Sequence, residues 1–328
     1  MTIVEELGKY HKVVSTFLDS YLREKSQMQI TFAQDLQTKL LPFLKRGKMI
    51  RASLILHLCS KWNCLDEHAI KIAAAMELYH GALLIHDDIM DNDSTRRGLP
   101  TIHTQYAEHK TKHYGEGQAI CLGDISFFLA NELLSNFPDI SRLYAQELVK
   151  TGFGQMQDLK LSYEQDTKKE TILEMFTYKT ARYTFVLPML AAAQYANYPH
   201  KDVLEEIGLL LGLVFQIKDD LLGLKGDPHI TGKAVGSDIR ERKATIYRAV
   251  LDEVLPLEEK EFVDSIYAKE EMSADDITCI TEKIFAYGVD TKVEAQLQNY
   301  YDDCIAVIQK TDITFLADLA EYLHTRDK

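Results

Sequence analysis

The sequence predicts an all-α fold from two observations. Glycine and proline are scarce, at 16 and 7 of 328 residues, whereas the good helix formers Ala, Leu, Glu, Lys and Gln run through most of the chain. Strand-like alternation of apolar and polar residues between turns is nearly absent. We therefore expect a bundle of ten or more helices. A hydrophobic content of 46% provides core for one sizeable domain or two small ones. Because no linker or repeat interrupts the chain, we expect a single domain over residues 1–328.

The long helices are expected where apolar residues follow helical spacing. Two of these segments, 66–88 and 203–224, are apolar on nearly all sides, which is typical of central, buried helices. Breaks are expected at Gly98–Pro100, Pro138, Pro199 and the polar stretch 225–238. The remaining long helices are expected over 116–135, 140–162 and 168–196.

The net charge of −13 limits the partners that we expect. Proteins that bind duplex nucleic acid usually have a basic face, so nucleic acid is not an expected partner. An acidic chain can still bind an anionic substrate where metal ions or local Lys and Arg clusters reverse the sign of the charge.

Cysteine usage and hydropathy indicate the compartment. The five cysteines are odd in number and form no C-x-x-C pair, which favours reduced thiols in the cytosol. The N-terminal stretch MTIVEELGKYHK lacks the apolar core of a signal peptide. The most apolar run, 207–215, is shorter than the ~18 residues that a membrane span needs. We expect a cytoplasmic protein with no membrane span.

The first apolar segment ends in the acidic stretch HDDIMDND (86–93). Asp87 and Asp91 are four residues apart, so on a helix both carboxylates lie on one face, at a cost of roughly 0.2–0.5 kcal/mol unless a cation joins them. They also lie near the helix C-terminus, where the helix dipole disfavours anions. Hard oxygen ligands at this spacing suit Mg²⁺, which binds one or two protein carboxylates, waters and substrate phosphates. The alternative for a single cluster is a solvated helix end.

A second acidic pair, Asp219 and Asp220, lies in KDDLLG (218–223) near the end of the other long apolar segment. Each cluster is followed by a polar loop that contains glycine and cations. Because two such clusters end two apolar helices, metal sites are favoured over two solvated helix ends.

Cations lie near both clusters and in a third place. Arg binds phosphate in a bidentate way and Lys as a point charge, so the pattern predicts two phosphate sites, one reached through metal and one direct. Any one of these cations alone is also explained as a solvated surface charge. They are Lys45, Arg46, Lys48 and Arg51 in KRGKMIR (45–51), Arg96 and Arg97 after the first cluster, and Lys179, Lys218, Lys233 and Lys243.

His80 lies seven residues before Asp87, two helical turns back and nearly in line with it. A histidine in an apolar helix is often a hydrogen-bonded core residue, so a core role and a pocket role both stay open. We expect His86 to be structural.

Six motifs in a fixed order together resemble the trans-isoprenyl diphosphate synthases of the polyprenyl synthetase family. The resemblance covers nearly the whole chain and implies an all-α fold around a central cavity. The motifs are G-K-x-x-R (47–51), H-x(6)-D-D-x-x-D-x(4)-R-R-G (80–98), G-D (123–124), G-Q-x-x-D-L (154–159), K-T (179–180) and F-Q-I-K-D-D (215–220).

The resemblance implies a role for each matching residue. Thr180 and Gln216 match polar groups near the allylic carbon. Metal ligands are implied at Asp87, Asp91 and Asp219, with Asp88 and Asp220 beside them. The allylic diphosphate site is implied at Arg96, Lys179 and Lys233, and the isopentenyl diphosphate site at Lys48, Arg51, His80 and Arg97.

One position departs from the family pattern. Gly223 stands where many members have the third aspartate of the second motif. Asp227, four residues further on, is the candidate to replace that aspartate through a bound water.

The resemblance also implies the reaction. Isopentenyl diphosphate condenses head to tail with an allylic diphosphate, which is dimethylallyl, geranyl or farnesyl diphosphate. Three Mg²⁺ ions clamped between the aspartate clusters, together with Arg and Lys, stabilise the departing diphosphate. An apolar cavity keeps water from the carbocation. The departed diphosphate takes the proton, so no dedicated basic side chain is needed. A homodimer is implied by the family and not by any motif.

The side chains before Asp87 are expected to set the product length. One isoprene unit is about as long as one helical turn, which rises ~5.4 Å, so the product grows along the helix past residues one and two turns back. Farnesyl diphosphate synthases of the family often have aromatic residues four or five positions before the motif. Leu83 and Ala82 stand there in this chain, and Tyr79 is the first aromatic residue.

Phe127 and Phe128 are expected either to close the tunnel from a facing helix or to be ordinary core residues. Because the first aromatic stands about one turn deeper than in farnesyl synthases, we expect geranylgeranyl diphosphate (C20) as the product. Farnesyl diphosphate (C15) and longer products (C25 and above) are the alternatives.

Three other functions stay open. A class I terpene cyclase shares the fold and a D-D-x-x-D motif, but it would leave the isopentenyl diphosphate residues without a role. A non-catalytic partner subunit of a prenyl synthase usually lacks the first aspartate motif, which is intact here. A metal-dependent phosphohydrolase would need histidines clustered with the carboxylates, and only His86 adjoins them.

Overall fold

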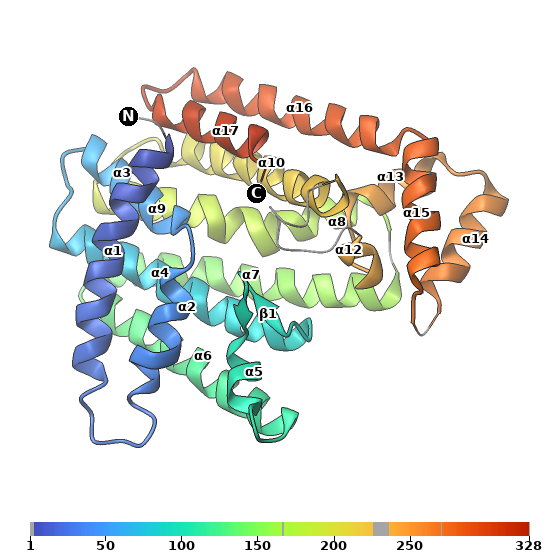
Figure 1. Cartoon of the computed structure of the whole chain (residues 1–328). Coiled ribbons are helices and arrows are strands. Elements are labelled where there is room, and N and C mark those ends of the chain that lie inside the picture. Colours follow the sequence, from blue (N-terminus) through green and yellow to red (C-terminus); the bar gives the residue numbers. More distant parts are fainter. Residues whose placement is uncertain (1–2, 166, 226–235, 270, 328) are drawn as a thin grey trace. The chain divides into compact units, whose positions relative to one another are not determined.

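The all-α prediction is confirmed in the computed structural model, which describes residues 3–165, 167–225, 236–269 and 271–327 (Figure 1). Within these ranges the only strands are β1 (Thr95–Arg96) and β2 (Leu99–Pro100). The helices are α1 (Ile3–Lys25), η1 (Leu36–Leu40), α2 (Leu41–Lys45), α3 (Ile50–Lys61), α4 (Glu67–Met90), α5 (Ile102–Ala107), α6 (Lys112–Leu134), α7 (Pro138–Glu164), α8 (Lys169–Phe176), η2 (Thr177–Val186), α9 (Leu187–Tyr195), α10 (Lys201–Lys225), α12 (Ser237–Arg240), α13 (Ile246–Val254), α14 (Leu257–Tyr267), α15 (Ala274–Ala286), α16 (Val289–Ile308) and α17 (Phe315–Thr325).

The chain forms two compact units. The first contains Met1–Ala145 and Pro188–Lys201, and the second contains Gln146–Leu187 and Asp202–Lys328. The single domain expected over residues 1–328 stays a prediction.

The first unit is built around α4, as its apolar sequence predicts. Every residue from Ile72 to Ala82 is buried, because α1, α2, α3, α5 and α6 all pack against this helix. The Asp66 side chain caps its N-terminus by accepting a hydrogen bond from the backbone N–H of Ala69 at 2.9 Å. The cap fixes where α4 begins, and the last turn of the helix carries the first aspartate cluster.

A short hairpin follows α4. Its strands pair Thr95 with Pro100 and Arg96 with Leu99, so the turn consists of Arg97 and Gly98 alone. Both turn residues have positive φ, 52° and 74°, as a two-residue hairpin turn of type I′ requires. This turn makes the two neighbouring arginines point apart, because one is paired in a strand and the other stands at the tip.

The second unit contains most of α7, then α8 and η2, and then α10 with the helices after it. In this unit α16 packs against α13, α15 and α17, and the adjacent α16 and α17 can be followed in Figure 1. The Thr245 side chain caps α13 by accepting a hydrogen bond from the N–H of Arg248 at 3.3 Å.

The sequence prediction of one regular helix over 168–196 is wrong in its middle. The segment consists of α8, the π-helix η2 and α9, and the N–H of Leu187 bonds to the carbonyl of Arg182 five residues back. Proline offers no N–H and clashes with the carbonyl four residues before it, so a wider turn accommodates Pro188. The same relation holds at η1, which ends two residues before Pro42.

None of the helices among the described residues combines the length and the apolar character needed to cross a membrane.

Candidate active site

The first aspartate cluster lies at the end of α4. Asp91 is the residue that closes the helix, and its N–H bonds to the carbonyl of Asp87 at 2.8 Å, so the expected one-turn spacing of these aspartates is present. Arg96 joins the cluster from the hairpin. Its guanidinium pairs with Asp88, with Asp87 at 3.2 Å and with Asp93 at 3.7 Å.

Asp88 is the buried member of this cluster. Its side chain is fully buried, and Oδ2 receives no hydrogen bond from any described residue. Burial raises the pKa of Asp88 to about 6 although Arg96 acts in the opposite direction. The fold therefore holds a carboxylate whose ionised form lacks part of its solvation.

Arg97 reaches a different part of the first unit. A Cβ added to Gly47 would lie 2.9 Å from Arg97 Nη1, so the close approach of this guanidinium needs glycine at position 47. Lys48, exposed, follows in the same turn, and Met49 before α3 has a positive φ of 48°. The hairpin thus sends Arg96 to the aspartates and Arg97 to the G-K-x-x-R motif.

His80 is joined to Arg51, as a role in one pocket requires. Arg51 Nη1 lies 3.2 Å from His80 Nε2. Because arginine only donates, Nε2 is the acceptor and the imidazole is neutral on this nitrogen. Burial, then the nearby Arg51, lowers the pKa of His80 well below its ordinary value. His80 therefore orients Arg51 and adds no positive charge near neutral pH.

Glu77 is a residue of this site that the sequence reasoning missed. It is buried on α4, one turn before His80, and its Oε1 accepts a hydrogen bond from the N–H of Ala52 at 3.1 Å. Burial raises the pKa of Glu77, and the charge of Arg51 opposes that rise. Glu77 thereby caps the first turn of α3, where Arg51 lies. A glutamate inside an apolar helix is the signal that could have revealed it.

A small basic pocket adjoins the hairpin. Its volume is about 240 Å³, and none of the described residues that line it is acidic. Its lining includes Arg96 and Arg97, Arg46 from the predicted phosphate-binding cations, and Lys39, which the sequence did not single out. Arg46 Nη1 donates to the carbonyl of Arg97 at 3.5 Å, so this part of the KRGKMIR motif supports the hairpin.

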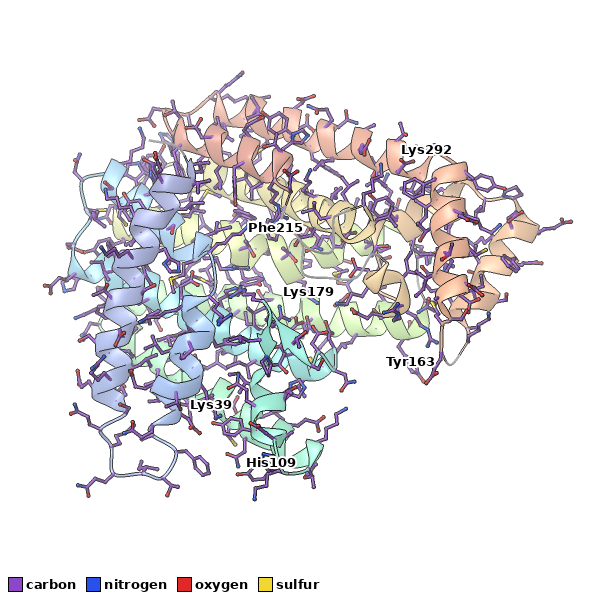
Figure 2. All side chains as sticks on the ribbon, viewed as in Figure 1. Lys39, His109, Tyr163, Lys179, Phe215 and Lys292 are labelled. Atoms are coloured by element: carbon purple, nitrogen blue, oxygen red, sulfur yellow. The ribbon has the colours of Figure 1, made fainter. Side chains whose placement is uncertain are left out.

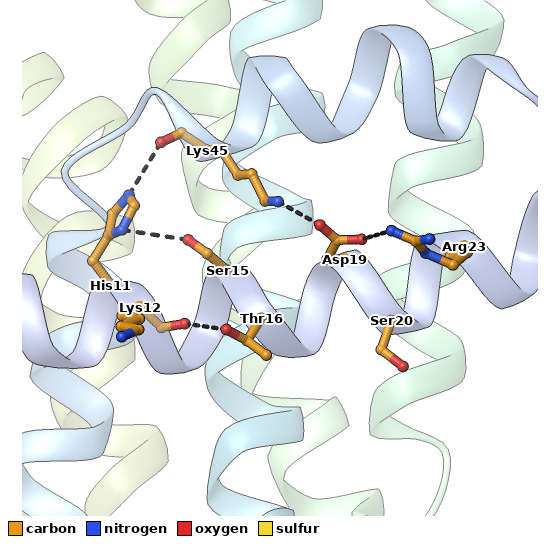
Figure 3. A pocket seen from close by; sticks show the side chains of 8 residues that line it. All are labelled: His11, Lys12, Ser15, Thr16, Asp19, Ser20, Arg23 and Lys45. Carbon is orange, nitrogen blue, oxygen red and sulfur yellow. Dashed lines mark hydrogen bonds and ion pairs between the residues drawn. The ribbon is translucent and has the colours of Figure 1, made fainter.

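Lys45 does not belong to this group of cations. It faces a separate groove along α1, where Lys45 Nζ pairs with Asp19 Oδ2 at 2.6 Å (Figure 3). The bonds from Lys45 and then Arg23 lower the pKa of Asp19. His11 Nε2 donates to the carbonyl of Lys45 at 3.1 Å, so the lysine is held at both ends.

The second aspartate cluster lies on α10 in the second unit. Asp219 pairs with Arg326, the residue that follows α17, and the same guanidinium donates to the carbonyl of Phe215 at 3.0 Å. It also lies 4.2 Å from the centre of the Phe215 ring, which Figure 2 labels. Nothing in the sequence pattern pointed to Arg326, since it lies 107 positions from its partner.

Asp220 supports the polar groups expected near the allylic carbon. Thr180 Oγ1 donates to Gln216 Oε1 at 3.0 Å, and Gln216 Nε2 donates to Asp220 Oδ1 at 3.2 Å. The other oxygen of Asp220 accepts from the N–H of Ile246 at 3.0 Å. Burial, then the charge of Asp238, raises the pKa of Asp220 well above its ordinary value. The chain of bonds fixes which atoms Thr180 and Gln216 present.

Lys179 projects from η2, where Figure 2 labels it, and pairs with Asp158 of α7. Two other lysines were named from the sequence. Burial lowers the pKa of Lys218, and Lys243 pairs with the nearby Glu241 at 3.0 Å. Lys233, expected at the allylic diphosphate, lies outside the described residues, and so does Asp227.

Gly223 has a structural explanation. A Cβ at this position would lie 2.6 Å from Oδ2 of Asp238, the carboxylate at the start of α12. An aspartate at 223 would require the Asp238 side chain to move and would place a second negative charge beside it. The sequence reasoning missed this neighbour. Asp238 of α12 thus supplies a carboxylate that acts on Asp220 from a different helix.

The side chains expected to limit the product meet within the first unit. The ring of Tyr79 lies 5.9 Å from that of Phe127 on α6 and 5.5 Å from that of Tyr144 on α7. Tyr79 also donates to Asn131 Oδ1 at 2.7 Å. Ala82, one turn nearer the aspartates, is fully buried, and Leu83 is half-buried.

The expectation for Phe128 is wrong. Its side chain is 70% exposed. Neighbouring residues of a helix point in different directions, so the residue after the inward-facing Phe127 faces away from Tyr79. His86, expected to be structural, packs its ring 5.7 Å from that of Phe127.

The carboxylates of both clusters have the chemistry that magnesium prefers. Among the described residues, no three or more His, Cys, Asp and Glu side chains converge on a common metal position. Magnesium usually takes one or two protein carboxylates and completes its shell with waters and phosphates. Asp87 and Asp91 in the first unit, and separately Asp219 in the second, therefore suit such a ligand role without a protein cage. The unsatisfied Oδ2 of Asp88 adds an acceptor beside them.

Comparisons with known proteins show the family of this chain. The family model described as polyprenyl synthetase matches residues 3–284. A geranylgeranyl diphosphate synthase of Sulfolobus acidocaldarius is 31% identical over 302 residues, covering 87% of this chain and 89% of its own. A geranylfarnesyl diphosphate synthase of Aeropyrum pernix is 30% identical over 248 residues, covering 72% and 74%.

Among solved structures, the geranylgeranyl pyrophosphate synthase of Corynebacterium glutamicum, complexed with isoprenyl diphosphate and magnesium, superimposes with a TM-score of 0.87. It is 27% identical, and the match covers 99% of this chain and all of that one.

The raised pKa of Asp88 predicts a pH-dependent stability difference. Because the folded-state pKa of about 6 exceeds the ordinary 3.8, the folded protein binds this proton more tightly than the unfolded chain. The contribution of Asp88 to the free energy of unfolding therefore falls as pH rises through this window, by up to about 3 kcal/mol. The variant Asp88→Asn should gain about that much relative to wild type between pH 4 and pH 7, measured by urea unfolding. Asp93→Asn, which loses a more exposed partner of Arg96, is the control, and an equal pH response in wild type and Asp88→Asn would contradict the prediction.

Proposed function

Because the chain belongs to the polyprenyl synthetase family and is a trans-prenyltransferase, we propose that it adds isopentenyl diphosphate to an allylic diphosphate and releases geranylgeranyl diphosphate. The observation that carries the product length is the aromatic layer of the buried Tyr79 and Tyr144 with the half-buried Phe127, one turn beyond Ala82 and Leu83. Relatives named geranylgeranyl and geranylfarnesyl diphosphate synthase match 87% and 72% of this chain and support a product longer than C15. A relative named farnesyl diphosphate synthase, which is 33% identical, matches 61% of it.

The residues near the aspartates hold the two substrates. Arg96 and Lys179, with Lys233, bind the allylic diphosphate, and Asp87, Asp91 and Asp219 hold Mg²⁺. Bound Mg²⁺, of which we propose three ions, supplies positive charge to the departing diphosphate. The relative complexed with isoprenyl diphosphate and magnesium supports the use of a divalent metal.

Lys48, Arg51 and Arg97 bind isopentenyl diphosphate, and His80 orients Arg51. The hydroxyl of Thr180 and the amide of Gln216 direct their dipoles at the carbocation. Apolar side chains along α4 exclude water from it. No basic side chain is assigned to remove the proton, because the departed diphosphate provides an acceptor.

Product analysis tests this function. Purified protein with Mg²⁺, labelled isopentenyl diphosphate and dimethylallyl, geranyl or farnesyl diphosphate should give C20 product from all three primers. Asp87→Asn should lower kcat by about 100-fold or more, because it removes charge stabilisation of the departing group. A C15 end product would overturn the proposed length. A hydrocarbon formed from farnesyl diphosphate alone would indicate a cyclase, and no condensation would indicate a non-catalytic subunit.

The length assignment predicts opposite results for two substitutions at one position. Tyr79→Ala should extend the product beyond C20, because it removes the ring that closes the path along α4. Tyr79→Phe keeps the ring and removes only the hydrogen bond to Asn131, so it should keep the C20 product. An unchanged product distribution for Tyr79→Ala, measured by chromatography of the dephosphorylated alcohols, would exclude Tyr79 as the limit.

We propose a homodimer from the apolar side chains that α6 and α7 expose. In the first unit, Ile120, Ile125 and Phe128 are exposed on α6. In the second unit, α7 separately exposes Phe153, Met156 and, at its far end, Tyr163, which Figure 2 labels. Soluble monomers rarely leave such apolar surface uncovered. Sedimentation velocity should give twice the chain mass of 37.5 kDa, and a monomer would contradict the proposal.

We also propose a cytoplasmic location, which the five free cysteines support.

A further inference from the structure

Two residues of the proposed reaction, Lys179 and Thr180, lie in the π-helix η2. We propose that Arg182 of the same π-helix and Glu147 of α7 are positioning residues. Their buried ion pair fixes the register of η2, and thereby the direction in which Lys179 and Thr180 point. This inference rests on the proposed function, because it concerns the orientation of two residues, Lys179 and Thr180, that we propose to act on the allylic diphosphate.

The ion pair has a single defined geometry. Arg182 Nε donates to Glu147 Oε2 at 2.6 Å and Arg182 Nη2 to Glu147 Oε1 at 2.9 Å, so the guanidinium grips both carboxylate oxygens. Both residues are buried, with 8% and 3% exposure. Burial alone would raise the pKa of Glu147, but the bonds from Arg182 and Lys150 keep it below its ordinary value. Glu147 is therefore ionised near neutral pH.

Stability alone does not explain this pair. Removing two charges from water costs several kcal/mol per ion, and well-packed apolar replacements of buried ion pairs are often as stable. A bidentate pair does, however, restrict orientation, because a planar fork meets a carboxylate in one alignment. Its distinctive contribution is geometric.

The π-helix needs such a restraint. Its hydrogen bonds join residues five apart, a geometry that is rare beyond a single turn and that competes with the ordinary helix on either side. A change to ordinary helical pairing would rotate the side chains within the segment. The backbone carbonyl of Arg182 accepts the last hydrogen bond of the π-helix, and its side chain forms the ion pair. One residue therefore links the π-helical hydrogen bonding to the ion pair.

Two glycines bring neighbouring helices against the same segment. A Cβ on Gly154 of α7 would lie 2.3 Å from the backbone nitrogen of Lys179, and one on Gly212 of α10 would lie 2.1 Å from Cβ of Ala181. These contacts set how close the backbone lies to each helix. They do not set its rotation, which the side-chain bonds determine.

The side chains of Lys179, Thr180 and Arg182 form their bonds with the same two helices, α7 and α10. Lys179 reaches Asp158 on α7, and Thr180 reaches Gln216 on α10. Arg182 follows in the same segment. It pairs with Glu147 on α7, and it also donates to Glu205 on α10 at 2.8 Å. A rotation of η2 that broke the Arg182 pair would therefore move Lys179 and Thr180 as well.

Steady-state kinetics separate this role from stability. Glu147→Gln should raise KM for geranyl diphosphate about tenfold, a loss of ~1.4 kcal/mol of binding, and leave KM for isopentenyl diphosphate within about twofold. Glu205→Gln is the matched control, because it changes the more exposed partner of the same arginine, and it should alter neither value.

The double variant Glu147→Leu/Arg182→Met gives the decisive result. Apolar replacement should restore the melting temperature that Glu147→Gln loses, but not KM for geranyl diphosphate, since the fork is gone. Wild-type KM values in this folded double variant would overturn the inference. If the double variant does not fold, Arg182→Lys, which keeps the charge without the fork, is measured below its melting temperature with the same two outcomes. Wild-type protein that forms no product at all would instead reject the proposed function.

Discussion

The structure depends on holding carboxylates together at the end of a buried helix. Asp87, Asp88 and Asp91 repel one another, lie where the helix dipole disfavours anions, and include one side chain with no exposure to solvent. They stay together because α4 is packed on all sides and because Arg96 pairs with Asp87 and Asp88. The two-residue turn of the hairpin leaves Arg96 paired with these aspartates and directs the neighbouring Arg97 toward Gly47. We propose that the charges serve a ligand at the expense of stability.

The second unit repeats this arrangement with different elements. Asp219 meets the guanidinium of Arg326, as Asp87 and Asp88 meet that of Arg96. Asp220 is tied to Gln216 and to the N–H of Ile246, so its position is fixed from two elements. In each unit an arginine pairs with the cluster and one aspartate of the cluster is buried. This division suits a site that binds cations and diphosphates, because the paired carboxylates can exchange one positive partner for another.

Much of this was predictable because it is local. Apolar surfaces on all sides predicted the burial of α4 and α10, and residue spacing predicted the shared face of Asp87 and Asp91. The features that the sequence did not predict depend on contacts between residues far apart in the chain or on details of backbone geometry. Arg326 and Asp238 meet their clusters only through folding, and Glu147 looks like an ordinary helix residue until Arg182 is placed beside it. The π-helix also escaped prediction, because apolar periodicity does not distinguish wider turns, although Pro188 marks its end. Phe128 was misplaced because two adjacent phenylalanines cannot face the same neighbour.

Ligand-induced stabilisation tests the central claim that the two aspartate clusters bind divalent metal with diphosphate. Anything that binds the folded protein raises its melting temperature, so Mg²⁺ with inorganic diphosphate should stabilise wild type more than either alone. Asp87→Asn and Asp219→Asn should each reduce this shift, and the double variant should abolish it while remaining folded. The same shift in wild type and in the double variant would contradict the account, because the ligands would then bind elsewhere.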